Sequence, residues 1–152
     1  METTTSSVPP PERNALNTPY WDSLASGSLA FQRCKQCGHA WLPVRSECPH
    51  CLVADWDWEK AAGGAKLISW VVYHTAFHPA FAGRLPYTVA VVELDEGPRL
   101  ISNVVGVDAA RPLAIDQRLR LVIEDESGTA VHAFGPPDRN RERQQCGPRR
   151  QT

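Results

Sequence analysis

The sequence predicts a mainly β protein with an N-terminal helix, a rubredoxin-like zinc ribbon and then a five-stranded OB-fold barrel. Three observations predict this order. Two Cys-x-x-Cys pairs lie ten residues apart in the first third of the chain. A short helical pattern precedes them, and five short runs rich in β-branched and aromatic residues follow them.

The predicted helix begins at Thr18 and ends at Gly27. Thr18 is a suitable cap for the free amides, and Pro19 fits the first helical position. Four apolar side chains then recur at helical spacing: Tyr20, Trp21, Leu24 and Ala25. One small ribbon cannot bury the large face of Tyr20 and Trp21, so we expect this face to pack on the second module or on another protein.

The two cysteine pairs predict a structural zinc site. Each pair places two thiolates on one tight turn, and two such turns supply the four soft ligands of tetrahedral zinc: Cys34, Cys37, Cys48 and Cys51. A redox centre is disfavoured because it needs a single pair in a thioredoxin-like pattern. Catalytic zinc is disfavoured because four thiolates leave no open position for water.

Residues around the quartet are expected to support it. His39 and His50 lie beside the turns, and we place them at the surface or behind the ligands because four cysteines already satisfy the ion. Gly38 suits the positive φ of such a turn, whereas Leu52 holds the equivalent place in the second, which predicts a slightly different shape there. Trp41 and Leu42 are expected to pack against the metal site.

The β module is predicted from five runs. They span residues 65–75, 86–94, 99–107, 118–124 and 129–134. Five short antiparallel strands in about seventy residues, without a long helical pattern, indicate a small barrel of the OB type, with a split β-sandwich as the alternative. Gly63 and Gly64 mark the junction with the ribbon, and we expect Trp56 and Trp58 to join the two modules.

The expected organisation has four segments and no single large core. They are a disordered arm (1–13), the helix and zinc ribbon (14–62), the OB-fold barrel (63–137) and a disordered Arg-rich tail (138–152). We interpret the fifth cysteine, Cys146, as a free thiol in that tail. The start of the chain lacks the pattern of a signal peptide and no apolar run is long enough to span a bilayer, so we expect a cytoplasmic protein with no membrane partner.

Charge is unevenly distributed along the chain. Five of the 16 Lys and Arg residues lie after residue 138, so residues 1–138 hold 11 basic against 16 acidic residues, a net charge of −5. Zinc ribbons and OB folds that bind nucleic acid need basic stripes on the folded part. The acidic body therefore argues against a nucleic-acid partner.

No catalytic set is evident in the sequence. It has no glycine-rich phosphate loop and no Gly-x-Ser-x-Gly elbow, and no Cys, His and acid group remains once zinc takes four cysteines. His74 and His78 flank a long loop that carries Phe77 and Phe81. The loop is either a partner-binding segment or one folded over the barrel mouth by its own aromatic side chains, and the sequence leaves both interpretations open.

Several motifs together resemble a known family, the acyl-CoA-associated zinc-ribbon OB-fold proteins (domain of unknown function 35). The resemblance spans about residues 17–135 and excludes the arm and the tail. The motifs are Pro19-Tyr20-Trp21-Asp22, Cys34-x-x-Cys37-Gly38, Cys48-Pro49-x-Cys51, Ser69-Trp70, His78-Pro79-x-Phe81, Leu85-Pro86-Tyr87 and 92–100. The family commonly has glycine where this chain has Leu52.

The resemblance implies a non-catalytic accessory subunit that docks on a thiolase-superfamily enzyme: a thiolase, an acyltransferase or a lipid-transfer-protein-like aldolase that cleaves steroid side-chain CoA thioesters. It implies a hetero-oligomer with acyl-CoA at or near the interface, and it carries over the four cysteines as zinc ligands. We expect partner or acyl-CoA contacts from an aromatic set: Tyr20, Trp21, Phe77, His78 and Phe81. A nucleic-acid-binding module and an independent acyl-CoA hydrolase are the rival functions.

Overall fold

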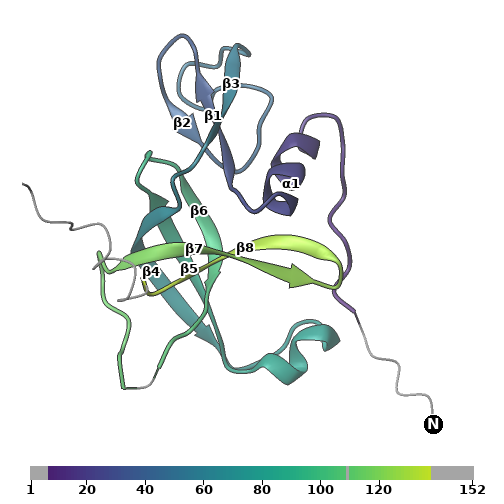
Figure 1. Cartoon of the computed structure of the whole chain (residues 1–152), viewed down its shortest axis with the longest axis vertical. Coiled ribbons are helices and arrows are strands. Elements are labelled where there is room, and N and C mark those ends of the chain that lie inside the picture. Colours follow the sequence, from purple (N-terminus) through teal and green to yellow (C-terminus); the bar gives the residue numbers. More distant parts are fainter. Residues whose placement is uncertain (1–6, 109, 138–152) are drawn as a thin grey trace, which may run out of the picture.

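The computed structural model describes residues 7–108 and 110–137, and it has a small ribbon sheet stacked on a barrel (Figure 1). The helices are α1 (Thr18–Ala25) and the 3-10 helix η1 (Pro79–Arg84). The ribbon strands are β1 (Ala30–Cys34), β2 (Ala40–Trp41) and β3 (Trp56–Lys60). The barrel strands are β4 (Gly64–Tyr73), β5 (Tyr87–Leu94), β6 (Arg99–Val104), β7 (Arg118–Glu126) and β8 (Thr129–Gly135).

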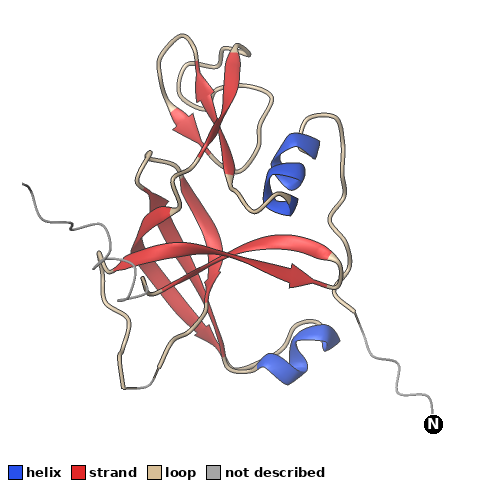
Figure 2. Ribbon diagram, viewed as in Figure 1, coloured by secondary structure: helices blue, strands red, loops and turns tan. Residues whose placement is uncertain are grey.

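The predicted fold class is confirmed, and the sandwich alternative is wrong. The ribbon sheet has the order β2-β1-β3, and the five later strands close into a barrel of order β4-β5-β6-β8-β7 (Figure 2). All barrel pairs are antiparallel except β6 with β8, which is parallel. The predicted strand ends differ by a few residues; β6, for example, stops at Val104 because Gly106 takes a φ of 66° and turns the chain.

Helix α1 begins where predicted, but Thr18 is not its cap. Asn17 holds the cap position and makes no side-chain capping bond. The Thr18 amide and hydroxyl both donate to the Asn14 carbonyl oxygen, at 3.0 and 2.6 Å, because a hydrogen-bonded turn already precedes the helix. Gly27 ends the helix as expected, with a φ of 86°. No helix in the described residues has the length and hydropathy to cross a membrane.

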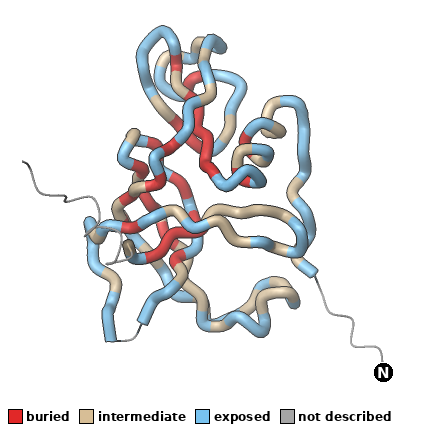
Figure 3. Tube along the Cα trace, viewed as in Figure 1, coloured by how far each residue is buried: buried red, intermediate tan, exposed pale blue. Residues whose placement is uncertain are grey.

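The core is continuous across the helix, the ribbon and the barrel, so the expectation that the chain has no single large core is wrong. Tyr20 and Leu24 from α1 join Leu29 and Phe31 from the start of the ribbon, and all four pack in one cluster with the barrel interior. Buried segments accordingly run from the ribbon base into the barrel (Figure 3). The reason is that α1 contacts both β1 and β8 and so fills the space between the two sheets.

The two tryptophans of β3 have different partners. Trp58 packs against the continuous core, as expected for a residue at the junction. Trp56 instead packs against the cysteines and Trp41, so its predicted role at the junction is wrong. The two rings meet edge to face at 5.4 Å, so one face of β3 extends from the metal site to the junction. The tail with Cys146, and residues 1–6 of the predicted arm, lie outside the described residues.

Candidate functional site: a four-cysteine metal centre and an aromatic surface

The two cysteine turns repeat the same hydrogen bonds. In the first turn the Cys34 amide donates to the His39 carbonyl at 2.8 Å, and the Gly38 amide donates to the Cys34 carbonyl at 3.0 Å. In the second turn the corresponding bonds join Cys48 to Val53 at 3.0 Å and Leu52 to Cys48 at 2.9 Å. The two knuckles are therefore equivalent in shape.

Leu52 adopts the backbone conformation that glycine holds in the first knuckle. Gly38 has a φ of 74° and Leu52 a φ of 63°. The predicted difference in shape between the knuckles is therefore wrong, because the turn imposes the left-handed conformation on whichever residue follows the second cysteine. The side chain of Leu52 is 72% exposed, so the fold gains no packing in return.

The four sulfur atoms are positioned to bind one metal ion. All lie within 4.8 Å of one another, and the closest pairs are Cys34 with Cys51 at 3.5 Å and Cys37 with Cys48 at 3.6 Å. Tetrahedral zinc with Zn–S bonds of about 2.3 Å requires sulfur pairs about 3.8 Å apart, so the donor set fits zinc in type, number and spacing. The Cys37 amide, 3.5 Å from the Cys34 sulfur, helps to lower the pKa of Cys34 to about 7.

Aromatic side chains surround the cysteines. Trp41 is 4% exposed and packs with Cys34 and Cys48 in a small cluster, as expected. Leu42 belongs to the continuous core instead, because it lies at the ribbon base. The His39 ring stacks on Trp41 at 6.3 Å and on His50 at 5.5 Å. In the described residues the group able to hold a metal consists of the four cysteines alone, so both histidines lie beside the centre.

A second feature is an aromatic ladder at the far end of the barrel, formed by Phe77, Tyr73, Tyr87 and Phe81. Successive ring centroids along the ladder are 5.9, 5.3 and 5.8 Å apart. Phe77 is 81% exposed, which makes it the most exposed large apolar side chain in the described residues. The aromatic side chains of the loop pack on one another, while Phe77 lies in solvent, and the partner-binding interpretation stays a prediction.

His78 has a structural role that sequence reasoning missed. Its Nδ1 accepts a hydrogen bond from the Ala80 amide at 3.1 Å and so caps η1. The His-Pro spacing could have indicated this, since Pro79 occupies the first turn of the short helix. Its ring also meets Phe81 edge to face at 6.2 Å. His74 is exposed.

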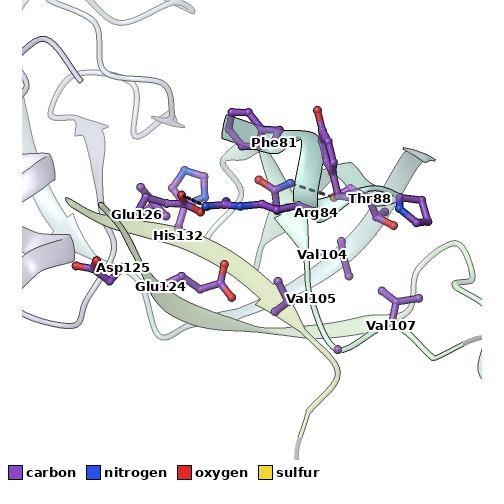
Figure 4. Close-up of a pocket in the computed structure, with 15 residues that line it drawn as sticks. Phe81, Arg84, Thr88, Val104, Val105, Val107, Glu124, Asp125, Glu126 and His132 are labelled. Atoms are coloured by element: carbon purple, nitrogen blue, oxygen red, sulfur yellow. Dashed lines mark hydrogen bonds and ion pairs between the residues drawn. The ribbon is translucent and has the colours of Figure 1, made fainter. Parts of the chain in front are cut away.

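A groove of about 690 Å³ runs beside the ladder, between η1 and the β7–β8 hairpin (Figure 4). Arg84 stands over the Phe81 ring at 5.2 Å, and its two terminal nitrogens donate to Glu126 at 2.5 and 2.7 Å. Glu124 also lines the groove, and its charge contributes to the raised pKa of Arg84. No local sequence pattern indicates this groove, because it joins residues about forty positions apart in the chain.

The predicted aromatic face of α1 is divided between core and surface. Tyr20 is 9% exposed, and burial raises its pKa, whereas Trp21 is only partly buried. Trp21 lines an apolar cavity of about 440 Å³ with Leu42, Ile101 and His132. A smaller cavity of about 270 Å³ reaches both Trp21 and Phe81. The structure thus brings Trp21 and Phe81 to one side of the barrel and withdraws Tyr20 from the surface.

His132 forms a buried polar pair that the sequence did not reveal. Its Nδ1 lies 2.7 Å from the Ser102 hydroxyl, and Ser102 is 5% exposed. Burial lowers the pKa of His132 to about 4, so the ring is neutral at physiological pH. The pair bridges β6 and β8 where their ladder is limited to Asn103–Ala133 and Val104–Phe134.

Comparisons with known proteins agree with this architecture. Residues 21–57 match the ChsH2 rubredoxin-like zinc ribbon domain, and residues 58–124 match the ChsH2 C-terminal OB-fold domain. A DUF35 domain-containing scaffold protein of Methanocaldococcus jannaschii is 35% identical over 107 residues, which are 67% of this chain and 75% of that protein. A probable enoyl-CoA hydratase alpha subunit of Thermomonospora curvata is 41% identical over 99 residues, 65% of this chain but 30% of that protein.

A solved structure described as an Ltp2-ChsH2(DUF35) aldolase has a chain 34% identical to this one, with a TM-score of 0.72, and the match covers 84% of this chain and 98% of that chain. The fold and the cysteine site thus define a zinc-ribbon OB-fold protein. Within that class, the chain belongs to the DUF35 family and carries both ChsH2-type domains.

Proposed function

We propose that the chain is a non-catalytic accessory subunit that docks on a thiolase-superfamily enzyme and supports its acyl-CoA chemistry. The partner classes are a thiolase, an acyltransferase and a lipid-transfer-protein-like aldolase of steroid side-chain CoA thioesters. Support comes from the relatives, which are named a scaffold protein, a hydratase subunit and a component of an aldolase complex. The observation that carries the proposal is a closed metal site combined with an aromatic ladder at the opposite end of the molecule, in which Phe77 is exposed.

A weaker rival is an independent acyl-CoA hydrolase, for which the structure offers Ser102 and His132 as candidate residues. Their 2.7 Å contact resembles part of a nucleophile–base pair. However, Ser102 is buried, and a histidine with a pKa of about 4 is a weak general base at neutral pH. The contact uses Nδ1, and no carboxylate is hydrogen-bonded to His132 in the described residues. The pair therefore fits a packing role better than a catalytic one.

The nucleic-acid alternative is disfavoured by the outer face of β5 and β6. Val91 on β5 stands opposite Ile101 on β6, which is 70% exposed, so this face is aliphatic. Both nearby cations are engaged by Glu93, which accepts from Lys66 at 3.0 Å and Arg99 at 2.6 Å, so neither is free for a phosphate. Nucleic-acid binding by an OB fold needs free cations and stacking aromatics on such a face, whereas an aliphatic face suits a protein partner.

Co-purification tests the proposal. The chain is co-expressed with a thiolase-like or lipid-transfer-protein-like enzyme encoded beside it, and the complex is isolated through a tag on the enzyme. We expect a stable complex that Trp21→Ala and Phe81→Ala each weaken, because aromatic anchors dominate interface energies. Ile115→Ala is the matched control, since Ile115 is 60% exposed on a separate loop. If the chain co-purifies with none of these enzymes, the proposal fails.

A further inference from the structure

The groove beside the aromatic ladder has an unbalanced charge. Among the described residues that line it, Arg84 is the only cation, and both terminal nitrogens of Arg84 are bound to Glu126. Glu124 adds a second carboxylate from the same face of β7, because residues two apart in a strand point the same way. Figure 4 shows Glu124 directed into the groove next to Arg84. The groove therefore carries a net negative charge.

Part of the wall around this charge is apolar or aromatic. Tyr87, Val104, Val107 and Val131 line the groove with Phe81, beside polar side chains such as Thr88 and Asn103. Glu124 is half-buried, and it forms no ion pair within the part of the chain that the structure describes. A guanidinium or ammonium group entering the groove meets an opposite charge and aromatic faces at once. A phosphate of CoA meets repulsion instead, which makes this groove unsuited to the acyl-CoA nucleotide.

The exposed apolar surface next to the groove indicates a protein as the occupant. The ladder continues from Phe81 through Tyr87 and Tyr73 to Phe77, and Val71, two residues before Tyr73 on β4, is 55% exposed. An apolar centre with a charged rim is the usual composition of a protein interface. The Arg-rich segment 138–152 of this chain offers charge, but it has no large apolar side chain to cover Phe77.

We propose that this groove receives an arginine or lysine side chain of the partner enzyme, while Phe77 and the ladder provide the adjoining apolar contact. This inference rests on the proposed function and assigns one contact surface to it. Glu124 is the specificity-determining residue, since Glu126 is already neutralised by Arg84. Phe77, His78 and Phe81 then belong to the protein interface rather than to the acyl-CoA channel.

The test measures the dissociation constant of the isolated complex for the wild-type full chain and three variants. Glu124→Gln removes one charge at constant shape, and we expect it to raise the dissociation constant about tenfold at low salt and to flatten its dependence on salt. Glu124→Lys should raise it about a hundredfold through like-charge repulsion. Glu47→Gln is the matched control, because it removes one exposed charge from the ribbon. Thermal melting of each variant checks folding.

The outcomes distinguish a failure of the groove assignment from a failure of the proposed accessory function. Wild-type affinity for both Glu124 variants overturns the groove assignment and leaves the accessory role intact. Absence of any complex with the wild-type chain overturns the accessory role itself. The same comparison of Glu124 with Glu124→Gln in a chain that ends at Pro137 tests whether the tail fills the groove. A tenfold difference in the dissociation constant that persists without the tail supports a partner cation. A difference that disappears assigns the groove to the tail and overturns the proposal.

Discussion

Leu52 holds a backbone conformation that its turn requires but that is unfavourable for a residue other than glycine. A non-glycine residue in the left-handed region costs roughly 1 kcal/mol, and Leu52 has a φ of 63° with its side chain in solvent. We therefore predict that Leu52→Gly stabilises the zinc-loaded chain by a few tenths to about 1 kcal/mol, part of the gain being lost to unfolded-chain entropy. Gly38→Ala, at a φ of 74°, should destabilise it by a similar amount. Urea unfolding measures the stability of both variants. Equal stabilities for Leu52→Gly and Gly38→Ala would contradict the conclusion that both positions require the left-handed backbone conformation.

His132 should make stability depend on pH. Its pKa is lowered by burial to about 4 in the folded chain, against about 6.5 when unfolded. The unfolded state therefore binds the extra proton first, so stability is complete above pH 6.5 and falls as pH drops toward 4. The shift corresponds to about 3 kcal/mol. Between pH 7 and 5, wild type should lose more stability than His132→Gln in urea titrations; parallel losses would contradict the burial of a neutral ring.

At the residue scale, spacing reveals chemistry only when the partners are close in sequence. The four cysteines were predictable because each pair occupies one turn and the two turns are ten residues apart. His132 and Ser102 were not, since their contact arises only when β8 is placed beside β6. Tyr20 and Trp21 were predicted to form one face that packs on the second module or on another protein. Neighbouring residues on a helix point in different directions, so Tyr20 is buried in the core whereas Trp21 is only partly buried against it.

Helix α1 is an element whose stability depends on one buried side chain. Leu24 is fully buried where α1 meets the barrel and the ribbon, so Leu24→Ala should cost about 3 kcal/mol through lost burial and an unfilled cavity. Asp22→Ala on the same helix removes an exposed ion pair with Arg13 and should cost less than about 0.5 kcal/mol. Denaturant midpoints compare the two; similar midpoints would show that α1 is not part of the core.

At the element scale, the strands were predictable but their closure was not. Runs of β-branched residues between turn signals marked all five barrel strands. Closure depends on pairing between β4 and β7, about fifty residues apart, and on two parallel pairs between β6 and β8. No local pattern encodes those registers. The short helix η1 also escaped prediction, because six residues with a glycine carry little periodicity.

For the whole molecule, zinc should stabilise more than the ribbon. Binding of a structural zinc ion contributes on the order of 10 kcal/mol in small ribbons, and here the ribbon base shares one core with α1 and the barrel. We predict that a chelator lowers the melting temperature of the far-ultraviolet β signal and of the tryptophan signal together, and that added zinc restores both. A barrel transition unchanged by chelation would show that the two parts fold independently.

The accessory role itself is tested most directly by reconstitution. The enzyme partner is purified without this chain and assayed for acyl-CoA turnover while the chain is added in increasing amounts. We predict that activity or solubility of the enzyme rises to a plateau at a fixed ratio of the two proteins, while this chain alone turns over no thioester. Turnover by the isolated chain, or an enzyme fully active without it, would contradict the accessory role.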